Sequence, residues 1–462
     1  MARATKREAV SAEPVEGPWD LPEGWRWDRL GDLCSYVNRG RGPKYVPANG
    51  VRVLNQRCIR WEGVDFTYCK QTDVAAAARL SAEQDLRGGD ILWNSTGTGT
   101  IGRAAVFRAA RDERFVADSH VTIVRLRDAD PCWVHHWIST HTVQQAVAGI
   151  GSTNQVELGR ETVLDLPVPR AQPDVERRTL ERIEGLFTEI EEGERALEAT
   201  GDAMATYRKA LLQAAFTGEL TEDWRGSRPM ATGHTLLSEI AARRKVATTR
   251  DPQSPAEEAM PDSLPDSWAW CSLGQLFSIY VGATPSRGEA QLWGGPIPWV
   301  SSGEVAFCRI GSTRELIAEC AVSADRVHPP GTVLLGMIGE GKTRGQAAIL
   351  DIAAAHNQNC ASIRVSETPI LPEYVYWWLE HRYQLTRADG AGGNQPALNK
   401  ARVAAIAIPL PPLAEIREIV RRLSAALAAS EAATEPVIEV KGIASTLRQS
   451  ILAAAFRGEL VA

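Results

Sequence analysis

The sequence lacks a long hydrophobic run, a leader-like N-terminus and any Cys-x-x-Cys pair, and each absence excludes a class of protein. No apolar stretch approaches the ~20 residues that a membrane span needs, and residues 1–20 have no hydrophobic core. The eight cysteines form no metal-binding or disulfide pattern, so we expect reduced, mostly buried thiols. We therefore expect a cytoplasmic protein that contacts no membrane.

Catalytic motifs are also missing. The chain has no Gly-x-Ser-x-Gly elbow, no His-Glu-x-x-His and no Asn/Asp-Pro-Pro-Tyr/Phe motif. His135, His136 and His141 do not align on one helical face, and no acidic or cysteine partner is close in sequence. We therefore expect a non-enzymatic chain with no metal or cofactor of its own.

An overall basic charge is absent as well, because the formal net charge is −6. The distribution is uneven, however. The segment between Asp32 and Glu62 contains no acidic residue and carries Asn38, Asn55 and Gln56 among six cations: Arg39, Arg41, Lys44, Arg52, Arg57 and Arg60. This composition suits a surface that neutralises phosphates and reads base edges, although a solvated basic loop explains it equally well. Residues 174–198 instead hold nine carboxylates against four arginines, which would repel DNA.

What the sequence does contain is a repeat of about 240 residues. Leu21-Pro22-Glu23-Gly24-Trp25-Arg26-Trp27 recurs as Leu264-Pro265-Asp266-Ser267-Trp268-Ala269-Trp270. Far downstream, Ala214-Ala215-Phe216-Thr217-Gly218-Glu219-Leu220 recurs as Ala454-Ala455-Phe456-Arg457-Gly458-Glu459-Leu460. The period is too long for a solenoid, so the repeat indicates a duplicated unit of domain size.

Each repeat begins with short β-rich runs and ends in a long helix. The runs of the first copy are 51–54, 91–93 and 121–126. From about residue 174 to 216 there is no proline, and apolar residues recur every seventh position: Ile183, Ile190, Leu197, Met204 and Leu211. The stripe of the second copy is Leu423, Ser430, Val437, Ala444 and Ile451, and Pro436 should kink or restart that helix. Because ~43 residues span about 65 Å, we expect the two helices to pack on one another.

A Gly-rich segment mimics a nucleotide-binding loop in each copy. Residues 336–343 fit G-x-x-x-x-G-K-[ST], but that motif needs a helix next, and 344–350 reads as a turn and a strand. The matching segment 97–102 contains no lysine. A shared Gly-rich hairpin explains both copies. The candidate polar residues of the second copy are Arg287, Ser301, Ser302, Lys342, Arg344, Asn357 and Asn359.

These motifs together resemble the specificity (S) subunit of type I restriction-modification systems. The carrying residues are the two Leu-Pro-x-x-Trp openings, the Gly-rich turns 99–102 and 339–345, the segment 408–415 and the helix exit 211–220. The resemblance covers the chain from Leu21 onward. It implies an α+β fold, with two pseudo-symmetric mixed α/β target-recognition domains joined by two long antiparallel, coiled-coil-like spacer helices.

The resemblance also implies a division of the chain and a set of partners. We expect an N-terminal tail (1–20), a first recognition domain (21–173), a central spacer helix (174–220), a linker with one short helix near 236–246 (221–262), a second recognition domain (263–413) and a C-terminal spacer helix (414–462). Each domain would read half of a split double-stranded DNA site. Two methyltransferase subunits would clamp the helices and bring S-adenosylmethionine, and two ATP- and Mg²⁺-dependent nuclease subunits could join them.

Within this interpretation the DNA-contacting candidates of the first domain are Asn38, Arg39, Arg41, Lys44, Arg52, Gln56 and Arg57. Two other functions fit parts of the sequence. One is a P-loop NTPase with a coiled-coil arm, in which Lys342 would hold phosphates. The other is a scaffold that joins partner proteins without touching DNA, for which the basic segment would have no role.

Overall fold

The computed structural model describes residues 15–42, 44–97, 99–108, 113–148, 157–226, 231–243, 264–339, 341–388 and 397–461. For residues 148 and 434–441 it describes the backbone only. Residues 1–14 of the expected tail, residues 227–230 and 244–262 of the expected linker, and residue 263 at the start of the expected second domain lie outside this range. No helix in the described part of the chain combines the length and hydropathy that a membrane crossing requires.

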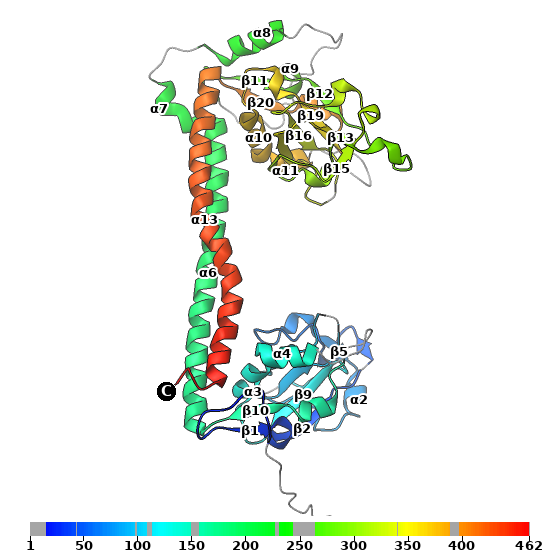
Figure 1. Ribbon diagram of the computed structural model, residues 1–462, viewed down its shortest axis with the longest axis vertical. Coiled ribbons are helices and arrows are strands. Elements are labelled where there is room, and N and C mark those ends of the chain that lie inside the picture. Colours follow the sequence, from blue (N-terminus) through cyan, green and yellow to red (C-terminus); the bar gives the residue numbers. More distant parts are fainter. Residues whose placement is uncertain are drawn as a thin grey trace, which may run out of the picture. The chain divides into compact units, whose positions relative to one another are not determined.

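The chain forms two compact units (Figure 1). Unit 1 comprises residues 1–197 and 438–462, and unit 2 comprises residues 198–437. Each unit therefore contains one β-rich copy, the first half of the helix that follows it and the last half of the other long helix.

Unit 1 contains a two-stranded sheet (β1-β10) and two four-stranded sheets (β2-β9-β6-β7 and β3-β5-β4-β8). Its strands are β1 (Arg26–Arg29), β2 (Cys34–Arg39), β3 (Tyr45–Val46), β4 (Val51–Leu54), β5 (Lys70–Thr72), β6 (Ile91–Asn94), β7 (Ala104–Val106), β8 (Phe115–Ala117), β9 (Val121–Leu126) and β10 (Pro167–Arg170). Its helices are α1 (Leu30–Leu33), α2 (Val74–Ala77), α3 (Pro131–Ile138), α4 (His141–Ala148), α5 (Arg160–Leu164) and the first part of α6 (Pro173–Thr217). The runs predicted from the sequence are β4, β6 and β9.

Unit 2 contains sheets of two, five and three strands, in the orders β11-β20, β12-β19-β16-β17-β14 and β15-β13-β18. Its strands are β11 (Ala269–Ser272), β12 (Ile279–Val281), β13 (Trp293–Val300), β14 (Cys308–Ile310), β15 (Glu315–Ile317), β16 (Val333–Gly336), β17 (Ala347–Leu350), β18 (Ala355–His356), β19 (Cys360–Ile363) and β20 (Ala407–Leu410). Its helices are α7 (Glu222–Arg225), α8 (Gly233–Arg243), α9 (Leu273–Leu276), α10 (Pro372–His381), α11 (Tyr383–Ala388), α12 (Lys400–Ala405) and the first part of α13 (Leu413–Phe456). The expected linker helix is α8, which begins three residues earlier than the sequence suggested.

The repeated Trp-x-Trp segment opens each unit as the same structural piece. Trp27 pairs with Pro169 across the antiparallel β1–β10 ladder, and Trp270 pairs with Pro409 across β11–β20. A short helix follows the first strand in both units, α1 in one and α9 in the other. The duplication seen in the sequence is therefore a duplication of fold.

The end of each long helix inserts a phenylalanine into an aromatic cluster. In unit 1, Phe456 lies 4.9 Å from Trp133 and 5.2 Å from Trp137, measured between ring centroids. In unit 2, Phe216 lies 5.3 Å from Tyr374 and 5.0 Å from Trp378. Both phenylalanines are almost completely buried. The repeated Ala-Ala-Phe motif thus anchors a helix end in each core.

The glycine that follows each of these phenylalanines ends the helix and makes room for the start of a repeat. Gly218 and Gly458 have φ angles of 87° and 77°, in the left-handed region that suits glycine. A Cβ atom on Gly218 would lie 2.5 Å from Cγ of Pro265, and one on Gly458 would lie 2.5 Å from Cγ of Pro22. The Gly-Glu-Leu and Leu-Pro motifs therefore recur together because they pack against each other.

The two long helices run antiparallel side by side within each unit (Figure 1). In unit 1, Arg448 of α13 donates two hydrogen bonds to Glu194 of α6, at 2.9 and 2.7 Å. In unit 2, the hydroxyl of Ser430 contacts the sulfur of Met204 at 3.4 Å. The expected pairing of the two spacer helices is confirmed. The expected restart at Pro436 is not seen, because α13 is a single helix from Leu413 to Phe456.

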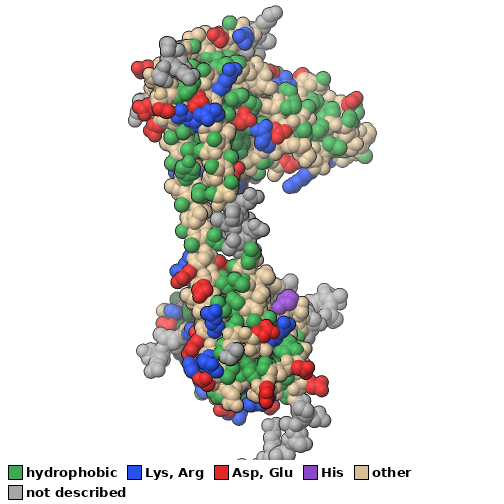
Figure 2. Space-filling view, turned by 60° about the vertical axis from the view of Figure 1, so that its left-hand side comes forward, with side chains coloured by type: hydrophobic (Ala, Val, Ile, Leu, Met, Phe, Trp, Pro, Cys, Tyr) green, Lys and Arg blue, Asp and Glu red, His purple; other side chains and the backbone are tan. Residues whose placement is uncertain are grey.

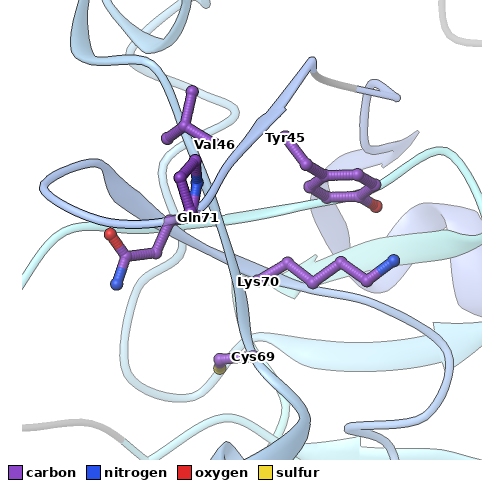
Figure 3. A pocket seen from close by; sticks show the side chains of 6 residues that line it. Tyr45, Val46, Cys69, Lys70 and Gln71 are labelled. Carbon is purple, nitrogen blue, oxygen red and sulfur yellow. The ribbon is translucent and has the colours of Figure 1, made fainter.

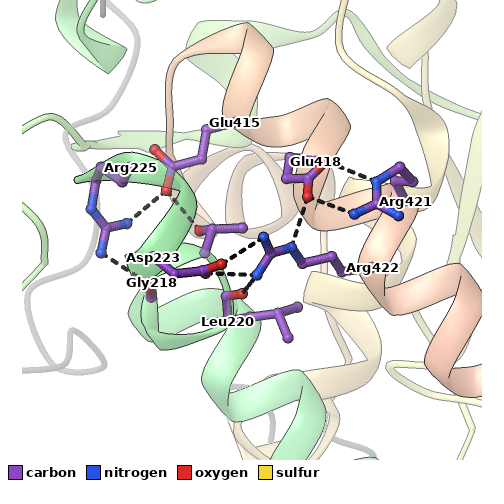
Figure 4. Close-up of polar contacts among 9 residues, drawn as sticks. Gly218, Leu220, Asp223, Arg225, Glu415, Glu418, Arg421 and Arg422 are labelled. Atoms are coloured by element: carbon purple, nitrogen blue, oxygen red, sulfur yellow. Dashed lines mark hydrogen bonds and ion pairs between the residues drawn. The ribbon is translucent and has the colours of Figure 1, made fainter. Parts of the chain in front are cut away.

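A network of ion pairs holds the beginning of α13 in unit 2 (Figure 4). The fully buried carboxylate of Glu415 accepts hydrogen bonds from Arg225 at 2.6 Å, Thr221 at 2.8 Å and the Trp268 indole at 3.0 Å. Nearby, Arg422 donates to Asp223 at 2.7 and 3.0 Å. Because a buried carboxylate is costly without partners, these bonds fix α7 against α13.

All eight cysteine thiols are free, and Cys34, Cys58, Cys271 and Cys360 are buried. Burial raises the pKa of Cys34, Cys271 and Cys360 to about 12. These three thiols therefore remain protonated at neutral pH and serve as core packing residues.

Candidate nucleic-acid interface

In unit 1, several loops meet where β4 and the parallel strand β8 end. The backbone N–H of Asp118 donates to the carbonyl of Leu54 at 3.0 Å, and that of Arg41 donates to Ala117 at 3.2 Å. The N–H of Ser95 donates to the carbonyl of His120 at 2.9 Å. We call the described segments 39–41, 55–57, 95–97, 99–103 and 118–120 the loop edge of unit 1.

Unit 2 repeats this arrangement bond for bond. The N–H of Asn357 donates to Val300 at 3.0 Å, that of Ala283 to His356 at 3.0 Å and that of Met337 to Asn359 at 2.8 Å. The described segments 282–284, 301–302, 337–339, 341–345 and 357–359 form the loop edge of unit 2. Backbone geometry is thus duplicated, whereas the side chains that it presents differ.

Four of the candidates predicted for the first copy lie on the loop edge of unit 1. The guanidinium of Arg39 donates to the carbonyl of Leu158 at 2.7 Å and forms an ion pair with Glu157. Gln56 accepts a hydrogen bond from the Thr100 hydroxyl at 3.3 Å. The other two, Arg41 and Arg57, are exposed. Arg39 and Gln56 are therefore bound internally, and Arg41 and Arg57 face solvent.

The remaining three candidates of the first copy lie apart from that edge or beside it. Asn38 is exposed on β2, one residue before the edge. Lys44 is exposed in the loop before β3. Arg52 lies within β4, where it forms an ion pair with Glu113 at 3.3 Å. Of the whole set, Arg52 and Arg39 already have a carboxylate partner.

The structure adds cation–aromatic contacts that the sequence did not reveal. Arg57 and Arg60 lie 4.6 and 4.9 Å from the ring centroid of Tyr68, and Lys70 lies 4.3 Å from that of Tyr45. Aromatic residues 8–25 positions from the cations in sequence give no local pattern from which these contacts could be recognised.

A shallow cavity of about 420 Å³ lies between Tyr45 and Lys70 (Figure 3). It is lined by Tyr45, Val46, Pro47, Cys69, Lys70 and Gln71. The Tyr45 hydroxyl donates to Asp118 at 3.3 Å, and burial together with this carboxylate raises the pKa of Tyr45 to about 12. The cavity therefore combines one ammonium group with a neutral phenol.

Most candidates of the second copy are held by internal bonds on the loop edge of unit 2. Ser301 donates to Glu304 at 2.8 Å, and Asn357, which is buried, accepts the N–H of Asn359 at 3.1 Å. The side chain of Asn357 also donates to Ser302 at 3.5 Å.

The three cations of the second copy have different surroundings. Lys342 is exposed, whereas Arg344 is buried. Arg287 donates to both carboxylate oxygens of Glu315 and stacks 3.8 Å from the ring of Trp293. Arg287 is exposed as well, but it is paired with a carboxylate.

Charged side chains of both signs are interleaved on the face of the molecule in Figure 2. The basic composition of 33–61 does not produce one continuous positive surface there. Carboxylates from later segments, such as Glu113 and Glu157, lie against cations of the basic stretch. Local charge therefore depends on residues that are distant in sequence.

The Gly-rich segment of each copy is a β-hairpin, as the sequence predicted. β16 pairs antiparallel with β17, and the turn between them carries Lys342. The Lys342 carbonyl accepts a hydrogen bond from the Tyr383 hydroxyl at 2.6 Å. In unit 1, β6 and β7 form the matching hairpin. A strand rather than a helix follows each turn, so the geometry of a phosphate-binding loop is not formed.

The three histidines that suggested a metal site have separate environments. His135 contacts the carbonyl of Ala104 at 3.0 Å, and His136 packs edge-on against Phe187. His141 contacts Gln145 at 2.7 Å. Burial lowers the pKa of His136 to about 3. These contacts describe packing residues.

A second pair of histidines lies beneath the loop edge of unit 2 and makes a pH prediction. His328 and His356 lie 5.0 Å apart between ring centroids, and burial lowers their pKa values to about 3 and about 4. Arg326 and Arg364 add to this depression at His328, while Asp325 opposes it. In the unfolded chain both rings take up protons below pH ~6.5. Because the unfolded state then binds more protons, the free energy of unfolding should fall as the pH is lowered from 6.5 to 4. Each histidine should contribute up to about 1.4 kcal/mol for each pH unit.

Urea unfolding followed by tryptophan fluorescence at pH 7 and pH 5 measures this effect. The double variant His328→Gln/His356→Gln should lose less stability than the wild-type protein between these pH values. His234→Gln, on the exposed face of α8, should leave the fall unchanged. Identical falls in the wild-type protein and the double variant would contradict the prediction.

Comparison with known proteins identifies the duplicated fold. Residues 265–440 match the family described as "Type I restriction modification DNA specificity domain". The chain is similar in sequence to type I specificity subunits. The EcoDI specificity subunit of Escherichia coli is 24% identical over 71% of this chain and 70% of its own length. The EcoKI specificity subunit of E. coli K12 is 20% identical over 96% of this chain and 90% of its own.

Solved structures agree with the relationship to specificity subunits at the level of fold. A chain from a structural study of complex assembly and conformational transition of the type I R-M system has a TM-score of 0.68. It is 20% identical and covers 96% of this chain and 100% of its own length. The HsdS subunit of Thermoanaerobacter tengcongensis has a TM-score of 0.53, with the same identity and coverage. The resemblance inferred from the sequence is confirmed.

Proposed function

We propose that this chain is the sequence-specific DNA-binding subunit of a type I restriction-modification complex. Each unit would read one half of a bipartite, asymmetric double-stranded DNA site. The observation that carries the proposal is the duplicated loop edge, in which equivalent backbone bonds are made by Arg41 and Asp118 in one unit and by Ala283 and Asn357 in the other. Duplicated readers with different side chains suit a site whose halves have different sequences.

The paired helices α6 and α13 would set the number of unread base pairs between the half-sites. They would also dock two methyltransferase subunits, and up to two nuclease subunits would complete the assembly. S-adenosylmethionine, ATP and Mg²⁺ would belong to those partners, and the partner would flip the target adenine out of the duplex. The chain itself would have no catalytic role. The names of the related specificity subunits and the antiparallel contacts of the helices support this assignment.

A long-read methylome of cells that express the chain with its methyltransferase tests the proposal. We expect one split, adenine-methylated motif that is absent from cells with the methyltransferase alone. Each half of that motif reports the sequence preference of one unit. An unchanged methylome, with the two proteins shown to associate, would instead favour a scaffold that does not contact DNA.

A charge-reversal pair separates these outcomes further. Arg41→Glu combined with Arg57→Glu should abolish methylation of the motif while association with the methyltransferase persists, because both side chains are exposed on the loop edge of unit 1. Arg79→Glu, also exposed but in the turn after α2, should have little effect.

A further inference from the structure

Tyr68 occupies a special position among the aromatic residues of unit 1. It ends a short helical turn, residues 66–68, whose first residue is preceded by Asp65. The Asp65 carboxylate caps that turn by accepting the backbone N–H of Thr67 at 3.0 Å. The ring of Tyr68 packs partly buried against the hydrophobic cluster that contains Leu54 and Cys58. The turn and the core together hold this ring in one orientation.

A buried amide ties Tyr68 to the loop that follows β4. The side chain of Asn55 is 5% exposed. Its Nδ2 donates to the carbonyl of Tyr68 at 2.8 Å, and its Oδ1 accepts the backbone N–H of Arg57 at 2.9 Å. Both ends of the amide are therefore used to bring the Arg57 loop against the Tyr68 turn.

Two guanidinium groups lie on the ring that is held in this way. Their Cζ atoms are 4.6 Å (Arg57) and 4.9 Å (Arg60) from the centroid of Tyr68. Within the described residues, neither arginine has a carboxylate oxygen within 4 Å. The nearby Asp65 is bonded to the hydroxyl of Thr67 at 2.6 Å. The two cations thus lie on an aromatic ring and form no ion pair within 4 Å among the described residues. Asp65 is nevertheless near Arg60, because its pKa is lowered first by the hydrogen bonds from Thr67 and also by the charge of Arg60.

We propose that Tyr68 is a positioning residue that holds Arg57 and Arg60 for the DNA backbone, and that the pair binds phosphate groups. A guanidinium that stacks on a ring keeps its N–H edge free, and that edge matches a phosphate. Stacking also restrains two side chains that would otherwise lose much conformational freedom on binding. The inference rests on the proposed function, because it requires that unit 1 contact DNA.

The surroundings favour phosphate over a base edge as the ligand. The cluster consists of cations on aromatic rings, and it continues through Lys70 on the ring of Tyr45. Reading a base needs a specific set of donors and acceptors, and the side-chain amide of Asn55, which holds the Arg57 loop, is already bonded to the backbone. Arginine and lysine side chains are the groups that commonly contact phosphates.

Unit 2 also has cations over aromatic rings, and several of them are paired with a carboxylate. Arg364, Arg326 and Lys400 lie 4.6, 5.7 and 5.8 Å from the ring centroid of Tyr280, and Arg364 and Arg326 form ion pairs with Glu367 and Asp325. Arg287, which stacks on Trp293, donates to both oxygens of Glu315. An arginine that is neutralised in this way contributes little to the release of counterions from DNA.

The experiment measures DNA binding by the full chain in complex with its methyltransferase. The probes are a duplex that carries the methylated motif and a scrambled duplex, each titrated between 50 and 200 mM salt. Arg57→Gln combined with Arg60→Gln should weaken binding to both duplexes. It should also lower the slope of log K against log salt by about 1.8, which is two phosphate contacts at about 0.9 each. The control Arg79→Gln/Arg114→Gln also removes two positive charges and should leave the slope unchanged.

Variants of Tyr68 test the positioning role. Tyr68→Leu should weaken binding to both duplexes by about 5- to 10-fold, since two stacking contacts are lost. Tyr68→Phe keeps the ring and should bind within about twofold of the wild-type protein. A thermal unfolding midpoint for each variant separates loss of folding from loss of positioning.

Each other outcome overturns the inference. Wild-type affinity in Tyr68→Leu would remove the positioning role. A loss confined to the methylated-motif duplex, with an unchanged salt slope, would assign the arginines to base reading. If the wild-type complex binds neither duplex, the proposed function itself is rejected. If the wild-type complex binds DNA and the variants bind equally well, only the inference about Tyr68 and the two arginines is rejected.

Discussion

Inserting seven residues into each long helix should abolish methylation at the original site and move it to a site with a longer gap. The insertions belong after Leu197 in α6 and after Val437 in α13, where the two units divide. Seven residues preserve the apolar stripe that includes Ile190, Leu197 and Met204. They lengthen a helix by about 10 Å, which corresponds to roughly three base pairs.

Both half-sites of the new motif should keep their sequences, because no residue of either loop edge changes. Three base pairs also rotate the duplex by about a third of a turn, so methylation at the longer gap should be weaker than in the wild-type protein. The methylome of cells that express the variant measures both effects. Insertion in α6 alone is the control, and it should reduce methylation without a new motif because the helices lose their register. Altered half-site sequences would contradict the role of the helices as a spacer.

Replacing Phe456 by alanine should destabilise unit 1 by about 3–5 kcal/mol. The Phe456 ring is almost completely buried between Trp133 and Trp137, so its removal leaves a cavity and detaches the end of α13 from the core. Phe216→Ala should have a similar effect in unit 2, since Phe216 contacts Tyr374 and Trp378 in the same manner. Urea unfolding followed by tryptophan fluorescence measures both losses.

Leu447→Ala provides the control for Phe456→Ala, because Leu447 lies on the same helix but is 45% exposed. It should change the free energy of unfolding by less than about 1 kcal/mol. Equal effects of the two substitutions would mean that the helix end is not anchored by its phenylalanine. Combining Phe216→Ala with Phe456→Ala should give nearly additive losses, since the two rings lie in separate cores.

Much of the fold could be predicted from the sequence because its signals are local. The absence of proline and the seven-residue stripe predicted a helix over about 174–216, and α6 spans Pro173–Thr217. Turn chemistry identified the hairpin around Lys342 despite its similarity to a nucleotide-binding motif. α13 continues through Pro436, so the helix does not restart there, and a kink at this proline stays a prediction. A proline weakens a helix, but packing of the rest of the helix can outweigh that local cost.

The candidate interface was less predictable, because a cation's availability depends on distant residues. Arg39 and its partner Glu157 are 118 positions apart, and Arg287 and Glu315 are 28 positions apart. A count of basic residues along the sequence treats Arg39 and Arg287 in the same way as Arg41 and Arg57. It also omits Tyr68, which has no charge and lies outside the basic segment.

The sequence by itself determined that the chain is a duplicated unit with a long helix after each copy. Repeats, heptad spacing and the glycines that end helices are patterns along the sequence. They specify secondary-structure elements without reference to tertiary contacts. Only the tertiary structure decided which polar side chains remain available on each loop edge. Parallel pairing of β4 with β8, and of β13 with β18, brings together loops that are far apart in sequence. Ion pairs and stacking contacts then form between residues that are distant in sequence. Arg39 and Arg287 are paired with carboxylates, whereas Arg57 and Arg60 stack on Tyr68.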